Sequence, residues 1–176
     1  MPIKLETPLT RDKIAELKAG DSVWISGEIY TARDAAHKRM VEQLDRGEKP
    51  PIDLENAVIY YAGPTPAKPG QVIGSCGPTT SGRMDAYAPR LIALGQTGMI
   101  GKGERAPQVV DAMCQHGAVY FGAIGGAGAL IAKSITAAQV VAYEDLGTEA
   151  IRRLTVKNFP AVVIIDVHGN NLYHRS

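Results

Sequence analysis

Apolar and polar positions follow one another along the chain in short blocks that favour strands and helices in turn. Runs rich in β-branched and aromatic residues are typical of strands and occupy residues 22–30, 57–61, 98–101, 118–121, 140–143 and 161–165. Apolar residues recurring at helical spacing predict helices over residues 10–20, 31–45 and 107–116, and another directly after residues 77–85. Strands alternating with helices are typical of an α/β domain built around a largely buried sheet.

The ends of these blocks refine the prediction. Gly27 lies inside the first long strand and indicates a bulge. Residues 166–173, with a polar and glycine centre, are typical of a terminal hairpin, which would make the sheet mixed. We therefore expect residues 1–176 to form a single α/β domain with a mixed sheet flanked by helices.

Composition narrows the class of protein. Hydrophobic residues make up 45% and charged residues 21% of the 176 residues, as in a globular domain that buries about 70% of its unfolded surface. The formal net charge of +1 argues against nucleic-acid or membrane-surface binding driven by bulk charge. The start of the chain lacks a signal-type apolar core, and the glycine-rich run at 117–132 is shorter than a membrane span. We expect a soluble, cytoplasmic protein without a nucleic-acid or membrane partner.

The two cysteines, Cys76 and Cys114, are too few for a disulfide framework or a closed zinc site. We expect both to be free, mostly buried thiols in a reducing compartment, and we expect no metal ligand in this chain.

Residues 77–85, with the sequence GPTTSGRMD, concentrate hydroxyls, a guanidinium, a carboxylate and backbone donors. Thr79 or Thr80 is suited to cap the helix that follows, whose first N–H groups would face an anion. Arg83 adds a planar fork that fits a carboxylate or phosphate. The alternative is a well-capped helix whose arginine lies on the surface.

Arg33, Arg83 and Lys102 share one placement, since each follows an apolar segment expected to be a strand. Those segments are residues 22–30, 71–74 and 98–101. Ligands of open α/β sheets bind beyond the carboxyl ends of strands, so the three cations are expected to converge on a small dianion such as a dicarboxylate. The alternative is a random scatter of cations at strand ends.

Other polar residues near these cations have supporting or alternative roles. His37 lies one turn after Arg33, and orienting Asp34 or a neighbour is as good an interpretation as catalysis. Asp85 is expected to orient Arg83 rather than to transfer protons. The glycine-rich residues 122–128 fit a dinucleotide fingerprint poorly, and a structural turn is the better interpretation.

Four motifs in this order resemble the class I fumarase family, specifically its C-terminal domain or β subunit. They are GPTTSGRMD (77–85), ARDAAH (32–37), IGKG (100–103) and GAIGGA (122–127). The resemblance covers residues 8–172, and the β subunit of L-tartrate dehydratase is a close relative. It implies a swivelling β/β/α domain and reversible hydration of fumarate to L-malate.

The resemblance also implies roles for single residues. Arg33, Arg83 and Lys102 would bind the substrate carboxylates, and Thr79 would stand at the position of the proposed catalytic base. A free hydroxyl is a weak base, so we expect Thr79 to act as a positioned proton relay, with substrate alignment as the alternative. The supporting residues are expected to be Asp34, His37, Thr80 and Asp85.

The family implies a four-iron iron–sulfur (4Fe-4S) cluster held by three cysteines, which two cysteines cannot supply. The cluster is therefore expected on a separate α subunit, in an α2β2 assembly or with a homodimer of this chain. Gly82 and the glycine–alanine run favour fumarate over tartrate, although both are four-carbon dicarboxylates. From another class, a non-catalytic anion- or nucleotide-binding domain stays as an alternative, as does a purely structural subunit.

Overall fold

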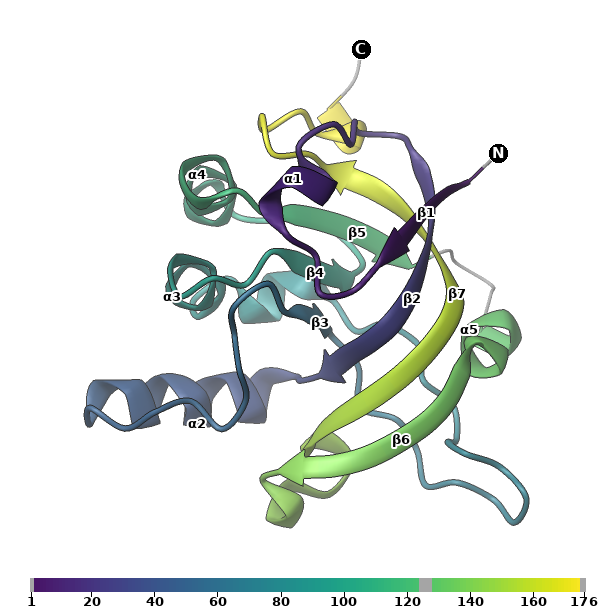
Figure 1. The fold of residues 1–176 in the computed structure, drawn as a ribbon. Helices are drawn as coiled ribbons and strands as arrows, with labels where there is room; N and C mark the ends of the chain where they lie inside the picture. Colours follow the sequence, from purple (N-terminus) through teal and green to yellow (C-terminus); the bar gives the residue numbers. More distant parts are fainter. Residues whose placement is uncertain (1, 124–127, 175–176) are drawn as a thin grey trace.

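A computed structural model describes residues 2–123 and 128–174 (Figure 1). The elements, with η for a 3₁₀-helix, are β1 (Ile3–Glu6), α1 (Arg11–Ile14), β2 (Ser22–Thr31), α2 (Asp34–Asp45), β3 (Val58–Tyr60), η1 (Ser81–Met84), α3 (Ala88–Ala93), β4 (Gly98–Gly101), α4 (Pro107–His116), β5 (Val119–Ala123), α5 (Gly128–Ser134), β6 (Ile135–Ala142), η2 (Glu144–Glu149), β7 (Ile151–Ile165) and η3 (Leu172–His174). No helix in the described part of the chain combines the length and apolar composition needed to cross a bilayer.

The strands form one seven-stranded sheet in the order β1-β2-β3-β4-β5-β7-β6, with a further pairing between β2 and β7. The strands from β1 to β5 pair in parallel, whereas β7 runs antiparallel to β2, β5 and β6. The prediction of a mixed α/β sheet with flanking helices is therefore confirmed. Because β7 pairs with both β2 and β5, the strands β2, β3, β4, β5 and β7 form a closed circuit of neighbours.

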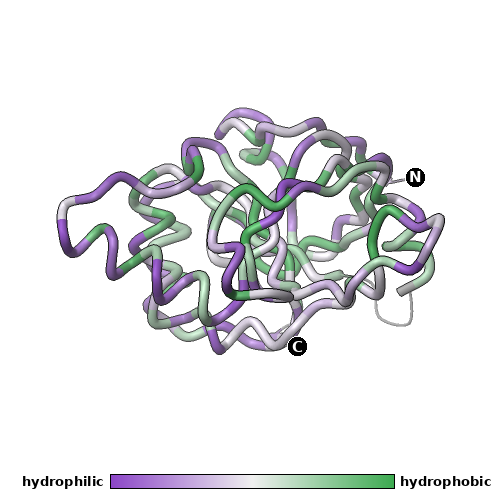
Figure 2. Tube along the Cα trace, turned by 90° about the horizontal axis from the view of Figure 1, so that it is seen from below, coloured by the Kyte–Doolittle hydropathy of each residue, from purple (hydrophilic) through white to green (hydrophobic). Residues whose placement is uncertain are grey.

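The two faces of the sheet bury two separate hydrophobic clusters, and successive strand residues alternate between them. In β5, for example, Val119 and Phe121 belong to one cluster and Tyr120 to the other. Helices α2, α3 and α4 contribute Met40, Leu91 and other residues to the second cluster, and they lie together on one side of the sheet (Figure 1). Hydrophobic segments gather towards the middle, with hydrophilic ones at the outer turns (Figure 2).

Several N-terminal elements lie where the sequence predicts them, but the helix predicted over residues 10–20 is only the short α1, and β1 was not predicted. The bulge at Gly27 is confirmed by a register shift between Ile25 and Gly27 and by a φ of 114° at the glycine. Strands β3, β4 and β5 and helices α2 and α4 coincide with predicted blocks within a few residues, and Gly117 ends α4 with a left-handed conformation.

Two predictions around the 77–85 motif are wrong. Residues 71–74 are not a strand: Gly74 N donates to Thr65 O and Thr65 N to Ser75 O, so the segment folds back on itself as a loop. The single helix expected after Thr79 or Thr80 is split into η1 and α3, and the Thr80 side chain makes no capping hydrogen bond. Leu94, three residues after the buried Leu91, is exposed.

The C-terminal part departs further from the prediction. Strands β6 and β7 are much longer than the predicted blocks, and β7 includes the polar stretch before residue 161. The expected hairpin is a tight turn with a single bridge between Ile165 and Asn171, followed by η3. The interpretation of the glycine-rich turn concerns residues 124–127, which lie outside the described residues.

Candidate functional site

Three chain segments meet at the C-terminal ends of the parallel strands β2, β3 and β4. Arg33 follows β2 and Lys102 follows β4, while the loop after β3 returns to the same edge. There, Thr79 N donates to Tyr61 O (2.8 Å), and Ser81 N donates to Lys102 O (2.8 Å). Thr80 and Lys102 form a parallel bridge. Although residues 71–74 are no strand, their loop therefore delivers the 77–85 motif to the predicted edge.

Arg33 and Arg83 lie on either side of Asp34. The Arg33 Nε atom is 3.9 Å from Asp34 Oδ1, and the Arg83 Nη1 atom is 4.0 Å from Asp34 Oδ2. A Cβ atom at Gly63 would come within 3.0 Å of Arg33 Cδ, so glycine there lets the arginine lie against the loop. The Arg83 side chain is 55% exposed and that of Arg33 26%, so both side chains have access to solvent. Two of the three predicted cations are thus neighbours.

Thr79 is half-buried, and Thr80 and Lys102 are exposed beside it. The backbone bonds described above place Thr79 next to the end of β3 and Lys102 next to the turn that carries Arg83. The four residues predicted to meet substrate therefore share one edge of the sheet.

Asp85 does not orient Arg83, contrary to the prediction. Its Oδ1 atom accepts a hydrogen bond from Arg105 Nε (2.8 Å), and its Oδ2 atom accepts one from Ala106 N (2.7 Å). In a 3₁₀-helix, with three residues per turn, residues two positions apart point in different directions. The carboxylate of Asp85 therefore faces inward while Arg83 faces solvent.

Arg105 was not singled out by the sequence, yet its side chain is fully buried beneath the site. Its guanidinium lies 5.2 Å from the Tyr61 ring centre and 4.8 Å from that of Tyr120. Burial opposes its charge, but the neighbouring Tyr61 and Asp85 raise the pKa of Arg105, so the side chain stays cationic. The only sequence signal is its place two residues before the proline that begins α4.

His37 is fully buried, and its Nδ1 atom lies 2.9 Å from the Arg33 carbonyl oxygen. Because a carbonyl can only accept, Nδ1 carries the proton. Burial lowers the pKa of His37 to about 4, so the ring is neutral at physiological pH. The histidine contacts the backbone of Arg33, a neighbour of Asp34, which agrees with an orienting role.

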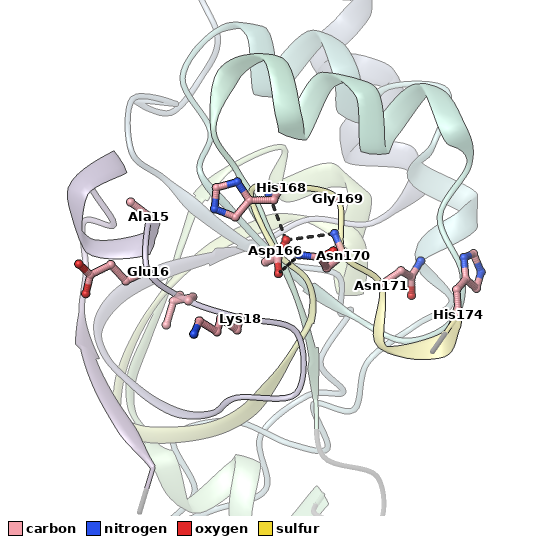
Figure 3. A pocket seen from close by; sticks show the side chains of 10 residues that line it. Ala15, Glu16, Lys18, Asp166, His168, Gly169, Asn170, Asn171 and His174 are labelled. Atoms are coloured by element: carbon pink, nitrogen blue, oxygen red, sulfur yellow. Dashed lines mark hydrogen bonds between the residues drawn. The ribbon is translucent and has the colours of Figure 1, made fainter. Parts of the chain in front are cut away.

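A cavity of about 830 Å3 lies elsewhere, lined by residues 15–18, 166 and 168–171 and by His174 (Figure 3). Figure 3 shows Asp166 turned towards the backbone of its own turn rather than into open space. Its carboxylate accepts hydrogen bonds from Ala19 N, His168 N and Asn170 N. None of the predicted substrate-binding residues lines this cavity.

The cysteines do not fit an iron–sulfur cluster. Cys76 is buried as predicted, and burial raises the pKa of its thiol to about 12. Cys114 lies exposed on α4, so the prediction of a buried thiol is wrong there. A cluster of this type needs thiolates, and two such separated thiols cannot supply three. Within residues 2–123 and 128–174, no three side chains of histidine, cysteine, aspartate or glutamate are grouped to hold a metal ion.

A family model described as Fumarase C-terminus matches residues 1–176. The chain belongs to this family. It is 38% identical over 178 residues to "Fumarate hydratase 2" of Leishmania major, and the match covers 99% of the chain and 31% of the relative. It is 42% identical over 153 residues to "Fumarate hydratase class I, aerobic" of Escherichia coli (strain K12), covering 86% and 28%.

A shorter relative is matched over most of its own length. The chain is 40% identical over 171 residues to "Putative L(+)-tartrate dehydratase subunit beta" of Methanocaldococcus jannaschii, covering 94% of the chain and 88% of the relative. The chain of this Fumarase C-terminus family thus spans less than a third of the two fumarate hydratases and nearly all of the β subunit.

Proposed function

We propose that this chain is the β subunit of a two-chain, iron–sulfur-dependent hydro-lyase that reversibly hydrates fumarate to L-malate. Within this proposal, residues 1–176 act as a single domain of the swivelling β/β/α type. The names of the relatives support the reaction class, and the near-complete match to a β subunit supports the division into two chains. A cytoplasmic location belongs to the proposal and rests on the free thiols of Cys76 and Cys114.

The observation that supports the proposal most is that the segments carrying Arg33, Thr79, Arg83 and Lys102 adjoin one sheet edge. Together with Asp34, three positive side chains and one negative side chain leave a formal excess of two positive charges. That excess matches a dicarboxylate, and each charge-assisted hydrogen bond contributes roughly 1.5–3 kcal/mol net. We assign the three cations to substrate carboxylates.

We assign Thr79 to proton transfer as a positioned relay. Its backbone N–H is tied to Tyr61 O, which fixes the hydroxyl near the end of β3. A threonine hydroxyl is a weak base at neutral pH and needs an activating partner. The partner subunit would supply that acid–base group.

The proposed partner is an α subunit that holds the 4Fe-4S cluster, since this chain lacks the thiolates to hold it. The cluster would supply Lewis-acid polarisation of the substrate oxygens. An α2β2 assembly, or a homodimer of this chain within a larger complex, accords with the two-chain proposal.

A second candidate substrate is tartrate, which the relative from Methanocaldococcus jannaschii favours by its name. Tartrate is also a four-carbon dicarboxylate, so the cations of the site suit it equally.

The test is to co-express the chain with an α partner that carries three cluster-type cysteines, and to purify the complex without oxygen. We expect hydration of fumarate by the complex and no activity from the chain alone. Dehydration of tartrate, with no turnover of fumarate, would shift the assignment to the second substrate. Activity of the isolated chain without iron, or a complex inactive on both substrates, would contradict the proposal.

A further inference from the structure

We propose that Arg105 is a positioning residue of this site, which holds the turn carrying Arg83 and the loop carrying Lys102 in a fixed relative position. This inference rests on the proposed function, because that function assigns Arg83 and Lys102 to the substrate. Arg105 itself is buried and does not reach the solvent-facing side of the site.

The first set of contacts around Arg105 is an ion pair with Asp85 that joins two segments of the chain. Arg105 Nε donates to Asp85 Oδ1 (2.8 Å), and the adjacent Ala106 N donates to Asp85 Oδ2 (2.7 Å). Asp85 directly follows η1, which contains Arg83. The two bonds therefore fasten the end of that helix to the segment three residues after Lys102.

The second set of contacts comes from a pair of tyrosines that enclose the guanidinium. Arg105 Nη2 donates to Tyr61 OH (3.2 Å), and Tyr61 O in turn accepts from Thr79 N (2.8 Å). Tyr120 OH donates to Gly103 O (2.9 Å) and lies 2.8 Å from Ser81 Oγ. Because the tyrosine hydroxyl has a single proton, Ser81 donates to it. The chain after Lys102 is thus tied to η1 and its C-terminal end through Gly103 and through Arg105.

Close packing leaves this arrangement little freedom to shift. A Cβ atom at Gly101 would overlap Ser81 Oγ and lie 2.9 Å from the Tyr61 ring. Only a planar guanidinium bonds Asp85 and Tyr61 at once while stacking on two rings, whereas a lysine ammonium offers a point charge. Arg105→Lys therefore keeps the charge and removes the geometry.

The test compares Arg105→Lys with wild type in the α–β complex, measuring kcat and KM for fumarate and the Tm. We expect kcat/KM to fall about 100-fold, since small displacements of binding groups cost that much. Arg90→Lys, at an exposed arginine paired with Asp45, is the matched control and is expected to keep wild-type kinetics. Unchanged kinetics in Arg105→Lys would overturn the inference.

A double-mutant cycle separates positioning from general destabilisation. If Arg105 acts through Arg83, adding Arg105→Lys to Arg83→Ala should cost about tenfold or less, because coupled residues are not additive. The same large factor in both backgrounds would overturn the inference. If Arg83→Ala alone has no effect, the proposed function fails; if only Arg105→Lys has none, the function stands and the positioning role falls.

Tyr120→Phe keeps the test decisive if Arg105→Lys does not fold. It removes only the hydroxyl that joins Ser81 to Gly103. We expect KM for fumarate to rise about tenfold with little change in kcat, since the loss falls on substrate binding. An unchanged KM in a folded complex would contradict the inference.

Discussion

Asp34 and Asp166 both follow long strands, yet they use their oxygen atoms in opposite ways. The carboxylate of Asp166 accepts hydrogen bonds from the backbone of Ala19, His168 and Asn170 and from the Asn170 side chain. Its turn is therefore complete without any ligand, even though it borders a cavity of about 830 Å3.

The sheet edge at the C-terminal ends of β2, β3 and β4, called the Asp34 edge from here on, has polar atoms that make no hydrogen bond. Among the described residues, three buried polar atoms have no hydrogen-bond partner there: Arg33 Nε, Asp34 Oδ1 and His37 Nε2. Arg33 Nε and Asp34 Oδ1 lie 3.9 Å apart, close enough for an ion pair but too far for a hydrogen bond. A buried polar atom without a hydrogen bond costs roughly 1–3 kcal/mol, so folding alone does not favour the arrangement. The comparison indicates that polar atoms without hydrogen-bond partners, rather than the size of a cavity, distinguish the edge to which we assign substrate binding.

The largest expected effect comes from removing a cation at the Asp34 edge. Arg83→Ala removes a proposed carboxylate ligand, and we expect kcat/KM of the complex to fall about 1,000-fold. His168→Ala, at the large cavity, is expected to leave the kinetics unchanged. Steady-state assays with fumarate measure both. A greater kinetic loss in His168→Ala would reverse the comparison.

The next effect concerns stability at the Asp166 turn. Hydrogen bonds from Asn170, Ala19 and His168 outweigh burial and hold the pKa of Asp166 below its usual range. Asp166→Ala removes the acceptor of the hydrogen bonds from His168 and Asn170, and we expect the free energy of unfolding to fall by about 3 kcal/mol. Urea denaturation measures it, with exposed Asp111→Ala as the control. The KM of the complex should stay at the wild-type value, and a large rise would place substrate at this turn.

Thr79→Val tests whether the hydroxyl of Thr79 transfers a proton or only aligns the substrate at the Asp34 edge. The substitution keeps the shape and removes the hydroxyl, so we expect kcat to fall about 100-fold, as for loss of a proton-transfer group. Thr79→Ser should retain most of kcat. If substrate alignment were the only role, Thr79→Val would raise KM and leave kcat nearly intact.

The placement of the cations was predictable because it depends on local signals. Apolar runs in the sequence indicate β2 and β4. Arg33 and Lys102 follow these runs, so they lie at strand ends regardless of how the loops fold. Arg83 reached the edge for a different reason than predicted, since a loop and not a strand precedes it. The turn residues of 77–85 were informative, whereas the apolar Val72 and Ile73 were not, because glycines on both sides favour a loop.

The sequence could not predict which residues pair with the buried polar side chains, because those partners lie far away along the chain. Asp85 meets Arg105 across 20 residues of sequence, in a contact that no local pattern around residues 77–85 indicates. Strand β7 contains Lys157, Asn158 and Pro160, which weaken any strand pattern, and its long pairing with β2 and β6 overrides that local preference. The burial of His37 likewise depends on packing against distant tyrosines.

The smallest expected effect follows from the neutral state of His37 at the Asp34 edge. Burial lowers its pKa from 6.5 to about 4, so the unfolded chain binds a proton more readily than the folded chain. Stability from this group is complete above pH 6.5 and is lost as the pH falls towards 4, which amounts to about 2 kcal/mol at pH 5. Urea denaturation at pH 7 and at pH 5 should show this loss of unfolding free energy in the wild type. The loss should be smaller by about 2 kcal/mol in His37→Gln. In His168→Gln, at an exposed histidine, the loss should equal that of the wild type. Equal pH dependence in wild type and His37→Gln would mean that the folded protein accommodates a charged His37. His37 Nε2 would then no longer count as a buried atom without a hydrogen bond that distinguishes the site.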